Sequence, residues 1–194
     1  MLEYLYRLPA LLIAITVHEF SHSYVANKLG DPTPKNAGRL TLNPFAHIDL
    51  LGALMLFIFR FGWAKPVPIN SYYFKDRNRG IIYVSLAGPL SNLIISVFTL
   101  IILKHVPLNT IIFNILLLVY WFNLNLSVFN LIPFSPLDGS HILYCLLPQD
   151  CRLDLQKYEK IGQLLLFVLL ITGAINYILD PILNGINKLL FYIT

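Results

Sequence analysis

Two histidines and a glutamate in the first apolar run have the residue types and spacing of a metal-dependent hydrolase. His18 and His22 are four residues apart, and Glu19 directly follows the first of them. Residues four apart share one face of an α-helix, so both imidazoles can reach a single zinc ion. Glu19 can then serve as general base toward a water at the metal. The alternative, two buried histidines satisfied by neighbouring polar groups, leaves Glu19 unexplained.

A third metal ligand is expected elsewhere in the chain, because catalytic zinc usually has three protein ligands and one open position. Asp138 is the candidate, in the sequence NLIPFSPLDG at residues 130–139, where prolines and a glycine interrupt an apolar run. Broken helices at membrane depth are tolerated where they are buried in protein or line a wet cavity. The alternative is a plain turn in which Asp138 caps the following segment, residues 141–147.

Four further polar residues could contribute to such a site. Asn130 could donate hydrogen bonds to a developing oxyanion, or cap carbonyls freed beside the nearby proline. Asn92, in the sequence AGPLSN, could line the site or be a satisfied amide at a packing kink. His47 and His141 are possible alternative ligands, but neither has a partner at helical spacing. Histidines in loops or cores are commoner than histidine ligands.

The elements that must position these residues belong to a membrane protein. The chain has 194 residues, of which 57% are hydrophobic and 12% charged, with a mean hydropathy of +0.67. An ordinary soluble enzyme needs roughly twice that charged fraction to coat its surface. The net charge of +4 comes from basic residues gathered in loops, so nucleic acid is not an expected partner. Two cysteines cannot form a disulfide framework.

Four apolar runs approach the roughly 20 residues that cross a bilayer. They are residues 2–28, 81–103, 110–131 and 161–179. Two shorter runs, 50–61 and 181–193, are not comfortably long enough, and the first of them is expected to be re-entrant or interfacial. The polar stretch after the first run is turn-rich, and we expect short β-strands at residues 39–42. The predicted fold is an all-α membrane bundle with about four to six membrane segments.

The distribution of basic residues predicts the orientation of this bundle. If residues 50–61 do not cross, 11 of the 14 Lys and Arg lie in the two polar loops on one side. The positive-inside rule then places both loops in the cytoplasm. The same topology brings Asp138 back to the side of the membrane where His18 and His22 lie, so the charge count and the proposed metal site agree.

Five motifs in this order resemble the site-2 proteases, a family of intramembrane zinc metalloproteases. They extend over roughly residues 8–145 and are HEFSH at 18–22, GRLTLNPFAHID at 38–49, GWAKPVP at 62–68, AGPLSN at 87–92 and NLIPFSPLDG at 130–139. The resemblance is closest to the small prokaryotic branch that carries neither PDZ nor CBS domains. One domain, residues 1–194, is expected, with a catalytic core at about 8–145 and C-terminal helices at about 152–194.

The resemblance implies the roles of particular residues. His18, His22 and Asp138 would bind one zinc ion per chain, and Glu19 would be the general base. Asn130 would bind substrate or the oxyanion. Asn92 would lie beside the active site and is a second candidate for that substrate or oxyanion role, although its duty is less defined.

The resemblance also implies the activity and its setting. The activity would be hydrolysis of a peptide bond within or near the transmembrane segment of a single-span membrane protein. The location would be the prokaryotic plasma or inner membrane, with the active site open to the cytoplasm. A proton or metal carrier is the rival interpretation, since intramembrane ionisable groups also mark transporters. Four spans without an inverted repeat offer little machinery for it. A small non-enzymatic membrane scaffold is a further alternative, and it predicts that His18, Glu19, His22 and Asp138 tolerate alanine.

Overall fold

Helices make up the regular structure of the protein in the computed structural model, which describes residues 2–52, 63–148 and 159–194. The α-helices are α1 (Leu2–Lys28), α2 (Thr33–Asn36), α4 (Arg77–His105), α5 (Thr110–Asn130), α6 (Asp138–Leu146), α8 (Glu159–Thr172) and α9 (Asn176–Ile193). Two 3-10 turns, η1 (Pro44–Ala46) and η2 (Ser71–Tyr73), lie in the polar loops. The expectation of an all-α protein is confirmed.

The β-strands expected at residues 39–42 are absent, and that prediction is wrong. These residues form an irregular loop, and the backbone N–H of Arg39 donates to the carbonyl of Pro34 at 2.8 Å. A strand needs a neighbouring strand to pair with its backbone groups, whereas this loop satisfies part of its own backbone locally. Within the described residues the only strand-like pairing is an isolated antiparallel bridge between Ile48 and Ala64.

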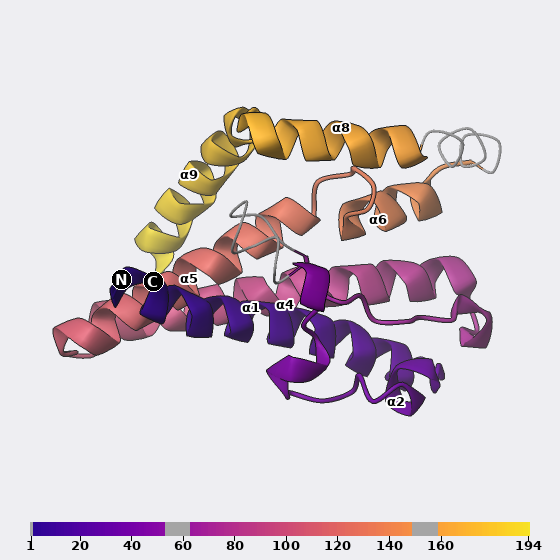
Figure 1. The fold of residues 1–194 in the computed structure, drawn as a ribbon, viewed down its shortest axis with the longest axis horizontal. Coiled ribbons are helices and arrows are strands. Elements are labelled where there is room, and N and C mark those ends of the chain that lie inside the picture. The colour runs from indigo at the N-terminus through magenta and orange to yellow at the C-terminus, as the bar shows by residue number, and fades with distance from the viewer. Residues whose placement is uncertain (1, 53–62, 149–158) are drawn as a thin grey trace.

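Helices α1, α4 and α5 lie side by side and form the centre of the fold (Figure 1). Each helix of the hairpin formed by α4 and α5 begins at a side-chain cap. The Asp76 side chain accepts a hydrogen bond from the N–H of Arg79 at 3.0 Å, and Asn109 accepts one from Ile112 at 2.9 Å. Such caps satisfy backbone donors that the first turn of a helix leaves free. The hairpin returns the chain to α6, which packs against α4.

Two helices, α4 and α5, are long and apolar enough to cross a membrane, and the pair α8 and α9 passes the same test jointly. Helix α1 matches the first predicted run and is 27 residues long, about 40 Å at 1.5 Å per residue. Three polar residues near its middle, His18, Glu19 and His22, make it less hydrophobic than α4 and α5. In the part of the chain that the structure describes, composition and length thus identify two spans, or three with the bent pair, while the total of four to six stays a prediction.

The last predicted span, residues 161–179, is not one straight helix. Helix α8 ends at Thr172 and α9 begins at Asn176, with a bend of 76° between them. Gly173 has φ +72°, a left-handed conformation that glycine adopts without steric cost and that commonly ends a helix. Helix α9 then continues to Ile193, so the short apolar run expected at 181–193 is part of this helix. The re-entrant piece expected at 50–61 lies largely outside the described residues.

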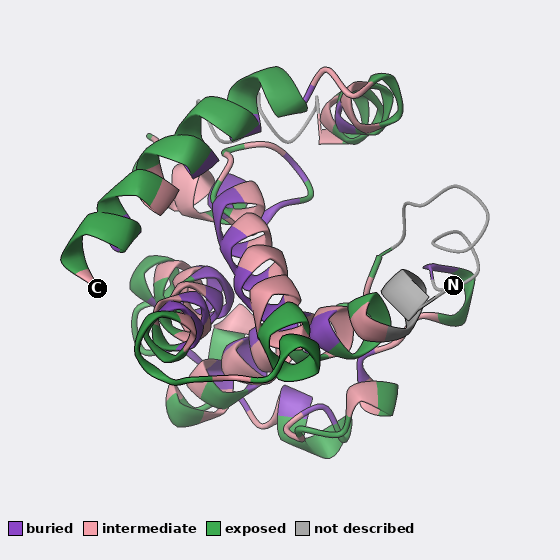
Figure 2. Ribbon diagram, turned by 90° about the vertical axis from the view of Figure 1, so that its left-hand side faces the viewer, coloured by how far each residue is buried: buried purple, intermediate pink, exposed green. Residues whose placement is uncertain are grey.

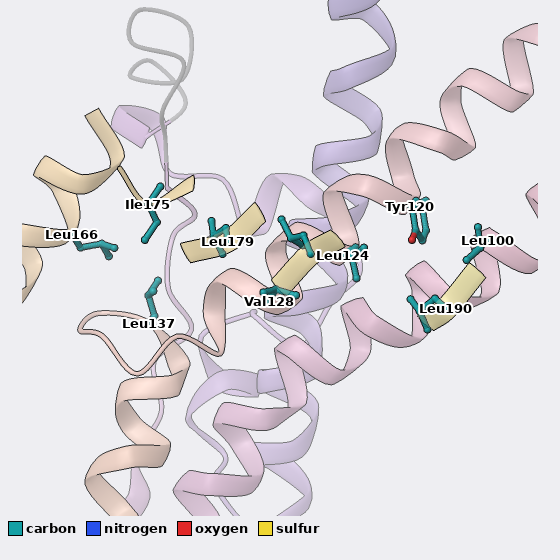
Figure 3. Close-up of a cluster of buried hydrophobic side chains, with 10 residues drawn as sticks. Leu100, Tyr120, Leu124, Val128, Leu137, Leu166, Ile175, Leu179 and Leu190 are labelled. Carbon is teal, nitrogen blue, oxygen red and sulfur yellow. The ribbon is translucent and has the colours of Figure 1, made fainter. Parts of the chain in front are cut away.

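An apolar cluster joins the two C-terminal helices to α5. Leu124 and Val128 of α5 face Leu179 of α9, and Leu137 lies toward Leu166 of α8 (Figure 3). The outer faces of α8 and α9 are largely exposed, whereas α5 is buried or half-buried from residue 115 to residue 130 (Figure 2). The cluster supports the loop that leads from α5 into α6, and therefore the position of Asp138.

Candidate metal centre

Three side chains from two distant segments meet where α1 passes the start of α6. The Asp138 Oδ2 atom lies 3.1 Å from His18 Nε2 and 3.3 Å from His22 Nε2. The three candidate ligand atoms all lie within 4.8 Å of one another. Both histidines are buried, and the Asp138 side chain is 16% exposed. The structure therefore brings together the two histidines and the aspartate singled out by sequence.

The outer nitrogen of His18 is held by an amide from another helix. His18 Nδ1 lies 2.7 Å from Asn92 Oδ1, and Asn92 Nδ2 donates to the carbonyl of Ala14 at 3.0 Å and to Asn123 Oδ1 at 2.7 Å. Both donor hydrogens of the Asn92 amide are thus used inside the protein. Its oxygen accepts from the imidazole, which requires the proton of His18 to be on Nδ1.

The outer nitrogen of His22 is held by backbone. His22 Nδ1 lies 2.7 Å from the carbonyl oxygen of Val84 in α4. A carbonyl oxygen can only accept, so Nδ1 carries the proton and Nε2 keeps its lone pair. Metal-binding histidines usually have this second hydrogen bond, which sets the tautomer and the orientation of the ring.

The donor set fits a bound cation. With each imidazole proton on Nδ1, the two Nε2 lone pairs and the Asp138 carboxylate converge without a hydrogen between them. Asp138 Oδ2 is buried and has no hydrogen-bond partner. Converging lone pairs around a buried carboxylate are unfavourable unless a positive charge lies among them. Two imidazoles and one carboxylate are also a ligand set that catalytic zinc sites use.

Glycines create the space for this approach. A Cβ atom added to Gly88 of α4 would lie 2.5 Å from His22 Nε2 and 2.7 Å from His18 Nε2. A Cβ added to Gly139 would lie 2.4 Å from the carbonyl oxygen of Leu131, so only glycine lets α6 start this close to the end of α5. Asp138 is the first residue of α6, where the positive end of the helix dipole stabilises a carboxylate.

Glu19 lies on α1 between the two histidines and is half-buried. The buried guanidinium of Arg39 is near it: burial lowers the pKa of Arg39, and the negative charge of Glu19 opposes that shift. Arg39 also donates to the carbonyl of Lys65 and lies 3.5 Å from His47 Nδ1. These contacts attach the loop that follows α2 beside the general-base candidate.

The remaining predicted residues do not join the three-residue cluster. The Asn130 side chain donates to the carbonyl of Leu126 on its own helix at 3.0 Å, so its oxyanion role stays a prediction. His47 is fully buried and its Nε2 lies 2.8 Å from the carbonyl of Thr41. His141 lies on α6 and is exposed. The expectation that His47 and His141 are weaker ligand candidates agrees with these positions.

Sequence reasoning missed one residue of the network, Asn123. It is fully buried in α5, accepts from Asn92, and donates to the carbonyl of Val119 at 2.8 Å. The available signal was an amide in an apolar run, since polar residues within membrane segments are costly and usually functional. Asn125 and Asn130 give the same signal on the same helix, so the pattern could not distinguish Asn123 from them.

Comparisons with known proteins identify the family. Peptidase family M50 matches residues 105–173. The chain is 38% identical over 189 residues to "Putative zinc metalloprotease YwhC" of Bacillus subtilis, an alignment that covers 93% of this chain and 86% of the relative. The chain belongs to Peptidase family M50.

Two other relatives are longer proteins. "Putative zinc metalloprotease Rip2" of Mycolicibacterium smegmatis is 32% identical over 85% of this chain and 66% of its own length. A zinc metalloprotease of Methanocaldococcus jannaschii is 27% identical over 86% of this chain and 42% of its own length. No solved structure matches the chain. The M50 protein is by family a zinc metalloprotease that cleaves peptide bonds in the membrane, and the resemblance to site-2 proteases is confirmed.

Gly88→Ala should weaken metal binding, because the added methyl group would occupy the space between the two imidazoles. Each ring is held at Nδ1 and cannot move away without losing that hydrogen bond. We expect zinc affinity to fall at least tenfold, because loss of a group that orients a metal ligand typically lowers metal affinity by roughly 10- to 100-fold. Zinc per chain, measured by elemental analysis of purified protein, checks this. Gly185→Ala is the control, since nothing lies within 4 Å of its added Cβ, and equal zinc in both variants would contradict the prediction.

Asn92→Leu should weaken zinc binding roughly 10- to 100-fold, because it removes the acceptor that orients His18. The affinity is measured by competition with a chelator of known zinc affinity. Asn125→Leu is the matched control: that amide donates to the carbonyl of Trp121 in its own helix at 2.7 Å and lies outside the network. An unchanged affinity in Asn92→Leu would show that this hydrogen bond does not position the ligand.

Proposed function

We propose that the M50 protein holds one zinc ion between His18, His22 and Asp138 and uses Glu19 as general base. The reaction is hydrolysis of a peptide bond within or near the transmembrane segment of a single-span membrane protein. The observation that carries this proposal is the convergence of two Nε2 lone pairs and an unpartnered carboxylate oxygen at 3.1 Å and 3.3 Å. The family supplies the reaction class.

The chain's own residues account for the proton transfers. When bound, zinc supplies Lewis acidity that polarises a carbonyl oxygen and makes water a stronger acid. Glu19 directly follows His18 and accepts the proton from the attacking water. It then returns that proton to the leaving amine, the usual duty of a general base that becomes a general acid. Asn92 and Val84 keep both imidazoles in the tautomer that leaves Nε2 available.

The substrate must expose its backbone before cleavage. A membrane helix has its carbonyls tied up in hydrogen bonds, so the segment at the scissile bond has to unwind. An unwound segment in an apolar setting then needs new hydrogen-bond partners. Asn130 is a candidate to bind its developing oxyanion, as the resemblance implies. The polar loop after α2, which Arg39 attaches beside Glu19, is a candidate to supply such partners.

We also propose that the active site opens toward the cytoplasm and that residues 1–194 act as one domain. The support is the charge count, with 11 of 14 basic residues in the two polar loops. The two ends of the 50–61 piece are held together on one side of the protein. Ile48 and Ala64 form an antiparallel bridge, and the backbone N–H of Lys65 donates to the carbonyl of His47 at 2.9 Å. At the other end, Lys104 and His105 contact the carbonyls of Phe191 and Thr194.

This orientation is tested with single cysteines in a background without Cys145 and Cys151. Tyr72→Cys lies in the polar loop and Tyr192→Cys at the opposite end, and both tyrosines are at least 80% exposed. In right-side-out vesicles, a membrane-impermeant maleimide should label only the Tyr192→Cys variant, and inverted vesicles should reverse the pattern. Labelling of Tyr72→Cys from outside would overturn the orientation.

Glu19→Gln should separate metal binding from hydrolysis. We expect zinc content close to one per chain, as in the native protein, and cleavage of single-span peptides slower by roughly 10²- to 10⁴-fold, because the amide cannot accept the proton. The assay uses purified protein in bilayer discs with a panel of synthetic single-span peptides carrying helix-breaking residues. Glu159→Gln is the matched control, since Glu159 contacts Ser135 rather than the cluster. Hydrolysis unaffected by Glu19→Gln, or none by the zinc-loaded native protein, would contradict the proposal.

A further inference from the structure

An apolar hollow lies between α1 and the loop that follows α2. Its volume is about 240 Å³, and its described lining is Leu12, Ile13, Thr16, Val17, Leu42 and Pro44. A cavity of about 150 Å³ lined by apolar side chains holds a benzene molecule. The hollow therefore has room for one aromatic or branched aliphatic side chain. Leu42 and Ile13 are exposed at its rim.

Thr16 is the only polar residue in this lining, and its hydroxyl has no partner. Thr16 is only 6% exposed, and its Oγ1 atom makes no hydrogen bond. A threonine inside a helix usually bonds to the carbonyl four residues earlier, as Thr99 does to Ile95 at 2.7 Å in α4. The Thr16 oxygen is itself buried, so the surface that the hollow offers to a ligand is apolar. Ser23 also lacks a partner, but it is fully enclosed by protein.

The hollow and the general-base candidate, Glu19, lie close together on helix α1. Thr16 precedes Glu19 by three residues, so the two lie on neighbouring turns of one helix face, about 4.5 Å apart along the axis. Residues 14, 18 and 22 form a different stripe, which faces α4 through the contacts of Asn92 and Val84. An extended chain rises about 3.3 Å per residue. A peptide whose scissile carbonyl lies at Glu19 reaches the hollow within one or two residues.

The loop that forms the other wall is firmly attached. Arg39 is 4% exposed and donates to the carbonyl of Lys65, and His47 is fully buried with its Nε2 at the carbonyl of Thr41. These contacts hold Leu42 and Pro44 against α1. The wall is thus present before any substrate arrives, as expected of a binding site that is largely formed in advance.

We propose that this hollow is a specificity subsite that takes one large apolar side chain of the unwound substrate segment, one or two residues from the scissile bond. The inference rests on the proposed peptidase function and adds the substrate class that the site prefers.

Cleavage preference is the first test. Single-span peptides carry Ala, Leu or Phe at each of three positions on either side of the cleaved bond. At one position the native protein should cleave the Leu or Phe peptide at least about tenfold faster than the Ala peptide. Ile13→Trp, which fills the hollow, should reduce that ratio to near one. Thr99→Val, in α4 and away from the hollow, should leave that ratio unchanged. An unaltered ratio in Ile13→Trp would overturn the subsite.

The second test does not depend on catalysis. The zinc-loaded Glu19→Gln variant is irradiated with peptides that carry a benzophenone side chain at the preferred position. The crosslink should map to α1 around Ile13 or to the loop at Leu42, and Ile13→Trp should abolish it. Crosslinking there without cleavage by the native protein would leave the subsite standing and remove the proposed peptidase function. Cleavage with crosslinks elsewhere, as expected if only lipid enters the hollow, would keep the function and overturn the subsite.

Discussion

The charge balance around Asp138 is the constraint on which the rest of the structure depends. The Asp138 Oδ2 atom has no hydrogen-bond partner and faces the Nε2 atoms of His18 and His22. Each of these rings carries its proton on Nδ1, where it is hydrogen-bonded to another group. In a mostly apolar bundle such a group is costly unless a cation is bound among the three. The glycine at position 88, the close start of α6 at Gly139 and the hydrogen bonds at both Nδ1 atoms all serve this one arrangement.

The polar interior of the bundle is arranged so that its side-chain amides have partners. The Asn92 amide connects three elements: it binds His18 and the Ala14 carbonyl on α1, and Asn123 on α5. Every donor and acceptor position that Asn92 uses is internal, which favours a positioning role over contact with substrate or oxyanion. Buried polar networks that are fully satisfied hold one geometry firmly. For a metal site, that firmness keeps the ligand atoms in place when no substrate is bound.

Helix α1 divides its work between two faces. The stripe of Ala14, His18 and His22 faces α4 and carries two of the candidate metal ligands, while Leu12 and Thr16 border the loop and Glu19 interacts with its Arg39. In the proposed mechanism the general base therefore lies between the face that carries the candidate metal ligands and the face that borders the hollow. A single helix can place both because neighbouring stripes on its surface are separated by a fixed rotation of the backbone.

The sequence by itself determined the local part of this protein. The spacing of His18, Glu19 and His22 sets their common helix through the 3.6-residue period, and Asp138 could be chosen because a third ligand was needed. The runs at 2–28 and 110–131 also agree with α1 and α5 within one residue at each end. Each of these features depends on neighbours in the chain or on a composition that a bilayer requires.

Only the tertiary structure decided how these elements meet. It showed that Asn92 contacts His18, that Asn123 contacts Asn92, and that the Val84 carbonyl contacts His22. It also placed the hollow between α1 and a distant loop. It also replaced the strands expected at 39–42 by a loop and broke the run at 161–179 near Gly173. The physical reason is that hydrogen-bond partners across helices depend on the rotation and depth of each helix, and these are set by packing between segments far apart in sequence.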